Sequence, residues 1–243
     1  MLKPMLRRLE KLRSNLADKG FDAILVSHQE NRRYLSGFTG SSGYLVVSAK
    51  HALLATDFRY FEQVKLEAPH FELVPLKGYG ARWLPETLSD IGAKRVAFEA
   101  AYLPFSSYRQ FVDAMTHAST DLQFIPEEGM VESLRAVKEA EELAFISAAA
   151  RLTHTALKRL TATVHPGVTE RELAWELERS LRENGSGPLP FDIIVASGPN
   201  AALPHLRPTE RVIGAGEPVV LDVGVRISGY CSDVTRTICL GQA

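Results

Sequence analysis

Hydrophobic positions recur at helical and strand spacing along the chain. Near its start Leu6, Leu9, Leu12 and Leu16 lie three or four residues apart, which predicts a helix that ends at Gly20. Apolar runs bounded by turn residues predict strands over 22–27, 43–49, 52–57, 71–76, 94–99 and 121–125. Helical spacing between them predicts helices over 30–36, 58–67, 82–91 and 105–116. Strands that alternate with helices indicate an α/β domain over residues 1–129.

The pattern changes after residue 129. A long helix is predicted over 139–164, and a second begins after Thr169 and runs to Asn184. Thr169 and Glu172 have the spacing of a capping box, in which each side chain bonds the other's backbone N–H. Strands then follow over 191–197, 217–227 and 229–240. We therefore expect residues 130–243 to form a second region of α+β type.

The last two strands carry Asp222 and Asp233. A turn centred between Ile227 and Ser228 would place the two aspartates directly opposite each other, with Cβ atoms ~4.5–5.5 Å apart. Carboxylates at that separation repel unless a cation or a shared proton lies between them. Two divalent metal ions would be clamped by this geometry, although aspartates at such spacing are also common without any metal. Asp222 stands in an apolar strand, where a buried charge requires a partner.

His205 lies in a proline-flanked loop before the last hairpin. A lone loop histidine is more often an exposed surface residue, but it can also donate a hydrogen bond to a substrate carbonyl or a developing oxyanion. The other histidines lack metal-ligand spacing, and no G-x-S-x-G, P-loop or G-x-G-x-x-G motif is present.

Composition narrows the classes of function. Among 243 residues, 28 are basic and 29 acidic, so no basic excess favours a nucleic-acid partner. No run approaches the ~20 apolar residues of a membrane helix, and the N-terminus lacks the apolar core of a signal peptide. Cys231 and Cys239 would stand ~27 Å apart on one extended strand, too far for a disulfide. Unpaired cysteines are typical of a cytoplasmic protein.

Three stretches resemble one known family. FDIIVASGPNAALPHLRP and LDVGVRISGYCSDVTRT are similar to the start of the pita-bread catalytic domain of Xaa-Pro aminopeptidases and prolidases. NRRYLSGFTGSSGYLVV and ATDFRYFEQ resemble the creatinase/prolidase N-terminal domain, which has a mixed sheet flanked by helices. SLRAVKEAEELAFISAAA resembles the junction between the two domains.

The resemblance implies a metallopeptidase that hydrolyses the peptide bond before proline. The family binds two divalent metal ions, manganese foremost and cobalt or zinc as alternatives, through two aspartates, one histidine and two glutamates. Asp222 matches the aspartate that chelates one metal, and Asp233 matches the one that bridges both. His205 matches the histidine that contacts substrate, and Phe191 matches a position near the substrate pocket. The implied partners are a peptide with proline second and a second copy in a homodimer.

The chain departs from the family at its end. The remaining histidine and two glutamates lie downstream of the second aspartate in the family, whereas this chain stops at Ala243. We therefore expect an incomplete pita-bread domain that is inactive alone. A non-catalytic peptide- or protein-binding module is one alternative, and a metal-free amidinohydrolase of creatinase type is another. Retention of both aspartates argues against each.

Overall fold

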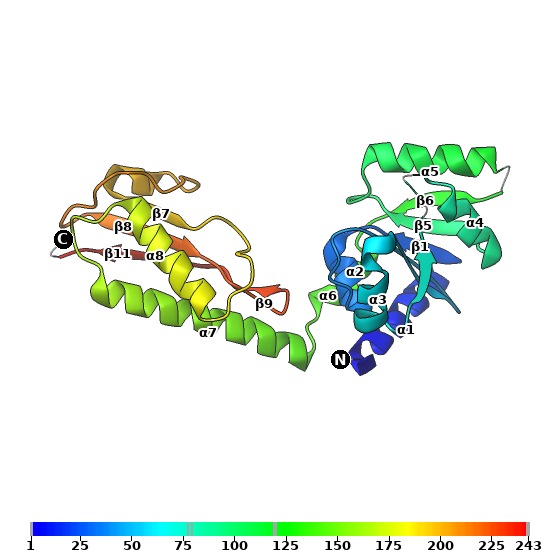
Figure 1. Cartoon of the computed structure of the whole chain (residues 1–243), viewed down its shortest axis with the longest axis horizontal. Coiled ribbons are helices and arrows are strands. Elements are labelled where there is room, and N and C mark those ends of the chain that lie inside the picture. Colours follow the sequence, from blue (N-terminus) through cyan, green and yellow to red (C-terminus); the bar gives the residue numbers. More distant parts are fainter. Residues whose placement is uncertain (1, 77, 79, 119–120, 242–243) are drawn as a thin grey trace. The chain divides into compact units, whose positions relative to one another are not determined.

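The computed structural model describes residues 2–76, 78, 80–118 and 121–241. The chain divides into two compact units, Met1–Val137 and Lys138–Ala243, shown from blue to green and from green to red in Figure 1. The boundary falls after the expected one at residues 129–130. Helix α6 accounts for the difference, because its Met130 and Val131 are buried in the core of the first unit.

The first unit is an α/β sandwich around a mixed sheet. Six strands lie in the order β4-β3-β2-β1-β5-β6, with β1, β5 and β6 parallel and β2 antiparallel to both of its neighbours. The strands are β1 (Ala23–Val26), β2 (Tyr44–Ser48), β3 (Ala52–Thr56), β4 (Glu72–Pro75), β5 (Arg95–Glu99) and β6 (Gln123–Glu127). The helices are α1 (Leu2–Asp18), α2 (Gln29–Ser36), η1 (Phe58–Tyr60), α3 (Phe61–Glu67), α4 (Trp83–Asp90), α5 (Phe105–His117) and α6 (Met130–Ala136). The predicted α/β class and the hairpin after residue 43 are confirmed.

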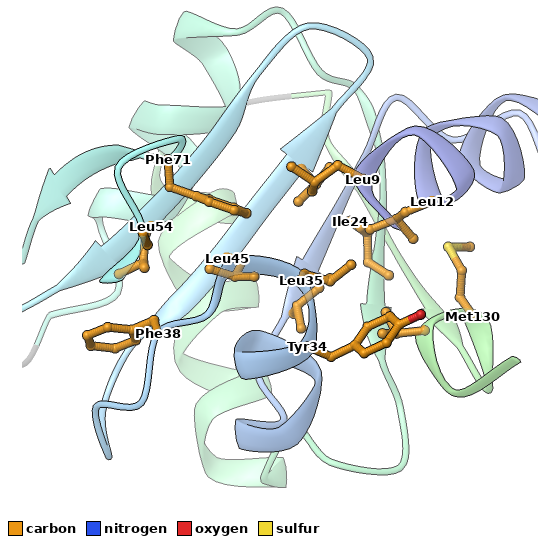
Figure 2. Close-up of a cluster of buried hydrophobic side chains, with 14 of the residues drawn as sticks. Leu9, Leu12, Ile24, Tyr34, Leu35, Phe38, Leu45, Leu54, Phe71 and Met130 are labelled. Atoms are coloured by element: carbon orange, nitrogen blue, oxygen red, sulfur yellow. The ribbon is translucent and has the colours of Figure 1, made fainter. Parts of the chain in front are cut away.

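Both faces of this sheet are covered by helices. Successive side chains of β1 point to opposite faces, so Ile24 joins the core beneath α1 and α2, whereas Leu25 joins the core beneath α4 and α5. Figure 2 shows the first of these cores, in which Leu9 and Leu12 of α1 lie near Ile24. Burial on both faces explains why the central strands are apolar throughout.

Glu99, at the end of β5, is a buried carboxylate that ties the sheet to α2. Its Oε2 accepts hydrogen bonds from the backbone N–H of Ser27 at 2.6 Å and of His28 at 2.7 Å. Its Oε1 accepts one from Nδ2 of Asn31 at 2.6 Å. A buried charge is tolerated when its oxygens are satisfied in this way.

The second unit packs two helices on one face of a small antiparallel sheet. Strand β8 lies between β7 and β11, and β9 pairs with β10 in a short hairpin. The elements are α7 (Ala140–Thr163), α8 (Glu170–Glu183), β7 (Ile194–Ser197), η2 (Gly198–Ala202), β8 (Pro218–Val223), β9 (Arg226–Ile227), β10 (Tyr230–Cys231) and β11 (Val234–Cys239). The capping box predicted at Thr169 and Glu172 is present. Leucines of α7 and α8 pack on Val219, Leu221 and Val223 of β8.

In the part of the chain that the structure describes, no helix is long and apolar enough to span a bilayer. Cys231 ends β10 and Cys239 ends β11, and both are free and exposed.

Glu99→Ala is expected to lower the free energy of unfolding by about 3 kcal/mol, because it leaves buried N–H donors without acceptors. Urea denaturation measures this loss. Glu128→Ala serves as the matched control, since Glu128 is exposed, and is expected to change stability by less than about 0.5 kcal/mol. Equal effects of the two substitutions would contradict the anchoring role of Glu99.

Candidate metal centre and substrate loop

Asp222 lies on the face of the second sheet that α7 and α8 leave uncovered. Along β8, Val219, Leu221 and Val223 are buried, whereas the residues between them are only half-buried. This alternation places Asp222 on the opposite face from the helices. Its partner there is Thr235 of β11, whose hydroxyl donates a hydrogen bond to Oδ1 of Asp222 at 2.8 Å. The strand is buried on one face, as expected, but Asp222 itself is only half-buried and lies on the other face.

The two aspartates are not directly opposed, which corrects the expected pairing. Asp222 pairs with Thr235 of β11, and Asp233 lies two residues before Thr235, just outside that strand. The turn is centred between Ser228 and Gly229, one position later than expected, with φ of 47° and 85°. Positive φ at both central residues is the mark of a two-residue type I′ turn, which sets the register of the whole hairpin.

The corrected register still puts both carboxylates on one face. Asp233 lies between β10 and β11, but the bonds between Ser232 and Val225 keep the hairpin in one register there, so Asp233 comes opposite Gly224 and shares the face of Asp222. The two become diagonal neighbours, whose Cβ atoms are typically ~7–8 Å apart or somewhat less. Asp222 is half-buried and Asp233 is exposed. Exposure lowers the repulsion that a directly opposed buried pair would suffer.

Ser232 holds the strand segment just before Asp233. Its N–H donates to the carbonyl of Val225 at 3.0 Å, and its hydroxyl accepts from the N–H of Val225 at 3.1 Å. The same hydroxyl lies 2.7 Å from the hydroxyl of Thr153 on α7, and both side chains are buried. The hydroxyl of Thr153 on α7 therefore fixes the backbone position next to Asp233.

Phe191 packs against the hairpin beside the aspartates. A Cβ placed on Gly224 would lie 2.8 Å from the ring of Phe191, 2.8 Å from Pro190 and 2.4 Å from the carbonyl oxygen of Ser232. Only a residue without a side chain permits this approach. Gly224 follows Asp222 by two residues in the chain, so Asp222, Asp233 and Phe191 are brought to one end of the sheet.

His205 stands apart from this group, on the loop that joins β7 to β8. It is exposed, as are Leu203 and Arg207 on either side of it. Arg207 forms an ion pair of 2.8 Å with Asp192, next to Phe191, but both side chains are largely exposed and the pair is weak. Among the described residues, no hydrogen bond joins His205 to Asp222 or to Asp233.

Glu170, the first residue of α8, is fully buried beneath this loop. Its carboxylate accepts hydrogen bonds from Ser197, Asn200 and Thr209. Burial alone raises the pKa of Glu170, but the bonds from Thr209 and Ser197 more than offset it and hold the pKa below its ordinary value. The group is therefore a buried anion at neutral pH.

Sequence reasoning missed Glu170, Thr235 and the contact between Ser232 and Thr153. A glutamate in the first turn of a helix is ordinary, because it favours the helix dipole, and nothing local marks Glu170 as buried. Thr235 follows from the register once the turn is placed at Ser228-Gly229. The contact between Ser232 and Thr153 joins residues far apart in sequence, and no local pattern indicates it.

The aspartates fit part of a metal centre. Carboxylate oxygens suit hard divalent cations, and both side chains face the same open surface. Within the described residues, no three His, Cys, Asp or Glu side chains gather closely enough to hold a metal ion. Asp222 and Asp233 thus supply a pair of donors that needs further ligands to complete a coordination sphere.

Comparison with known proteins agrees with this arrangement of domains. Residues 8–137 match the creatinase/prolidase N-terminal domain, and residues 144–243 match metallopeptidase family M24. An Xaa-Pro dipeptidase from Bacillus anthracis superposes with a TM-score of 0.91 at 38% identity, over 98% of this chain and 66% of that one. An X-Pro aminopeptidase from Thermotoga maritima gives a TM-score of 0.84 at 32% identity, over 96% and 65%. A peptidase of Bacillus subtilis is 36% identical over 97% of this chain and 65% of its own length.

These matches define a two-domain protein with an N-terminal creatinase-type domain and a part of a metallopeptidase domain. The chain belongs to the creatinase/prolidase family by its N-terminal domain, and an M24 metallopeptidase domain follows that domain. It spans about two thirds of the length of the relatives that it matches.

Gly224→Ala tests the packing beside the aspartates. The added methyl group overlaps the carbonyl of Ser232 and the ring of Phe191, so we expect the free energy of unfolding to fall by about 2 kcal/mol. Denaturation measures the loss, and NMR follows the amide signals of Val225 and Ser232. Gly80→Ala is the control, because nothing lies within 4 Å of its added carbon. A neutral Gly224→Ala would show that the close approach is not required.

Proposed function

We propose that this chain is the larger part of a proline-directed metallopeptidase, an Xaa-Pro dipeptidase or aminopeptidase. The main support for this proposal is that Asp222 and Asp233 lie on the uncovered face of a sheet whose other face packs against helices. Relatives at 38% and 32% identity are described as an Xaa-Pro dipeptidase and an X-Pro aminopeptidase, which supports the substrate class.

Asp222 and Asp233 would hold two divalent metal ions together with ligands from a polypeptide longer than this chain. Oxygen donors of this kind favour manganese, with cobalt or zinc as alternatives. When bound, such ions supply an activated water and polarise the carbonyl of the scissile bond. Other residues of the chain orient the two carboxylates. The hydroxyl of Thr235 donates to Oδ1 of Asp222, and Ser232 fixes the backbone next to Asp233.

Phe191 and His205 are proposed to contact the peptide. Phe191 lies against Gly224, so its ring borders the end of the sheet that carries the aspartates. Such an apolar surface suits the ring of a proline residue. His205 is exposed on its loop, and its imidazole can donate a hydrogen bond to the carbonyl oxygen on which negative charge develops.

Cellular location and assembly also enter as proposals. Two exposed, unpaired cysteines support a reducing compartment such as the cytoplasm, and localisation in living cells tests it. The homodimer rests on the family resemblance alone. The homodimer is proposed for the longer polypeptide, and analytical ultracentrifugation that shows that polypeptide as a monomer at micromolar concentration would refute it.

The test of function uses the polypeptide read from the gene beyond codon 243, with manganese added. We expect hydrolysis of alanyl-proline or of a longer Xaa-Pro peptide, and the preferred length separates dipeptidase from aminopeptidase. Asp222→Asn and Asp233→Asn are each expected to lower kcat/KM by at least ~100-fold, since they remove metal ligands. Glu176→Gln is the control, because it makes the same change of charge on an exposed part of α8.

Two outcomes would contradict the proposal. Peptide binding without hydrolysis by that polypeptide would favour the binding module. Tight calorimetric binding of two manganese ions by the 243-residue chain alone would show that further ligands are not needed.

A further inference from the structure

The loop that carries His205 has little packing of its own. Between Ala202 and Arg207 every residue is exposed except Leu206, which is half-buried. Its backbone N–H groups make short local bonds, from Leu203 to the carbonyl of Asn200 at 2.9 Å and from Leu206 to that of Leu203 at 3.2 Å. A loop of this kind opens easily unless its ends are fixed, because few buried contacts oppose opening.

Both ends of the loop meet at one buried carboxylate. Ser197, where the loop begins, donates to Oε1 of Glu170 from its N–H and its hydroxyl, each at 2.8 Å. Thr209, where the loop ends, donates to Oε2 from its N–H at 3.1 Å and its hydroxyl at 2.6 Å. Nδ2 of Asn200 lies between, at 3.1 Å from Oε1 and 3.2 Å from Oε2.

A second contact joins the same two ends. The guanidinium of Arg211 donates to the hydroxyl of Ser197 at 2.7 Å and is held by the carboxylate of Glu217. Gly198 makes room for this ion pair, because a Cβ there would lie 2.7 Å from Arg211. Arg211 is thus oriented across the base of the loop, and Glu170 fills the space beneath it.

We propose that Glu170 is a positioning residue that holds residues 198–209 closed at both ends and so fixes His205 in place. Each oxygen of Glu170 accepts from a different end of the loop, so the loop must close for the buried charge to be satisfied. The consequence for catalysis rests on the proposed function, in which His205 contacts the peptide. The positioning itself does not depend on that function.

Glu170→Gln in the 243-residue chain is the test. The substitution keeps the shape of the side chain but turns one acceptor oxygen into an NH2 group that faces donors, so the loop loses its anchor. We expect amide hydrogen exchange over 198–209 to rise about 10- to 100-fold, while exchange in β8 and in the middle of α8 stays unchanged. The NMR signals of the His205 ring should also shift, with those of the other histidines unmoved.

Glu172→Gln is the matched control. It removes the same charge from the same turn of α8, but the carboxylate of Glu172 accepts its hydrogen bonds from Thr169, which precedes the helix and lies outside the loop. In Glu172→Gln, amide hydrogen exchange over 198–209 and the NMR signals of the His205 ring should match those of the unsubstituted chain. Thr209→Val is a milder variant that removes one donor to Glu170, together with the acceptor of the Arg211 N–H, and should raise exchange over 198–209 by a smaller factor.

The outcomes are separable. Unchanged loop exchange in Glu170→Gln, or an equal rise across β7, β8 and α8, would overturn the proposal. If Glu170→Gln fails to fold, Thr209→Val decides by the same exchange measurement. A loosened loop together with an inactive longer polypeptide would leave the positioning intact and reject the peptidase function.

Discussion

Two residues in the left-handed region, Ser228 and Gly229, set the geometry on which the candidate metal centre depends. A two-residue type I′ turn joins β9 and β10, so it fixes which residues pair across the rest of the hairpin. If one strand slipped by a single residue against the other, Asp233 would point to the helix-covered face, because side chains alternate along a strand. With the turn where it is, Asp222 and Asp233 face the same open surface.

The rest of the second unit holds this hairpin in place. The hydroxyl pair of Thr153 and Ser232 connects α7 to the strand that carries Asp233, and the ring of Phe191 fills the space above Gly224. Glu170 at the start of α8 holds the loop of His205 by accepting from Ser197. Arg211 holds the same loop by donating to the hydroxyl of Ser197. Rigid elements thus position exposed polar side chains, which is the usual division between scaffold and site.

The fold was largely predictable because its signals are local. Apolar spacing located most strands and helices of both units, and the capping box at Thr169 marked the start of α8, but α6 and η2 were not predicted and the last two predicted strands are each interrupted. Two features were not predictable from local pattern. The prediction that the aspartates are directly opposed was wrong, because the Ser228-Gly229 turn lies one position later than assumed. Glu170 was missed because the residues that donate to it lie 27–39 residues away. The metal roles of Asp222 and Asp233, and the substrate roles of His205 and Phe191, remain predictions.

The measurement that most directly tests the central claim is NMR of this chain during titration with millimolar Mn(II). A paramagnetic ion broadens signals close to its binding site, and weak binding is sufficient. The account predicts selective broadening at Asp222, Asp233 and Thr235 that Asp222→Asn removes. Broadening centred instead on Glu99 of the first unit, with the signals of Asp222 and Asp233 unaffected, would contradict it.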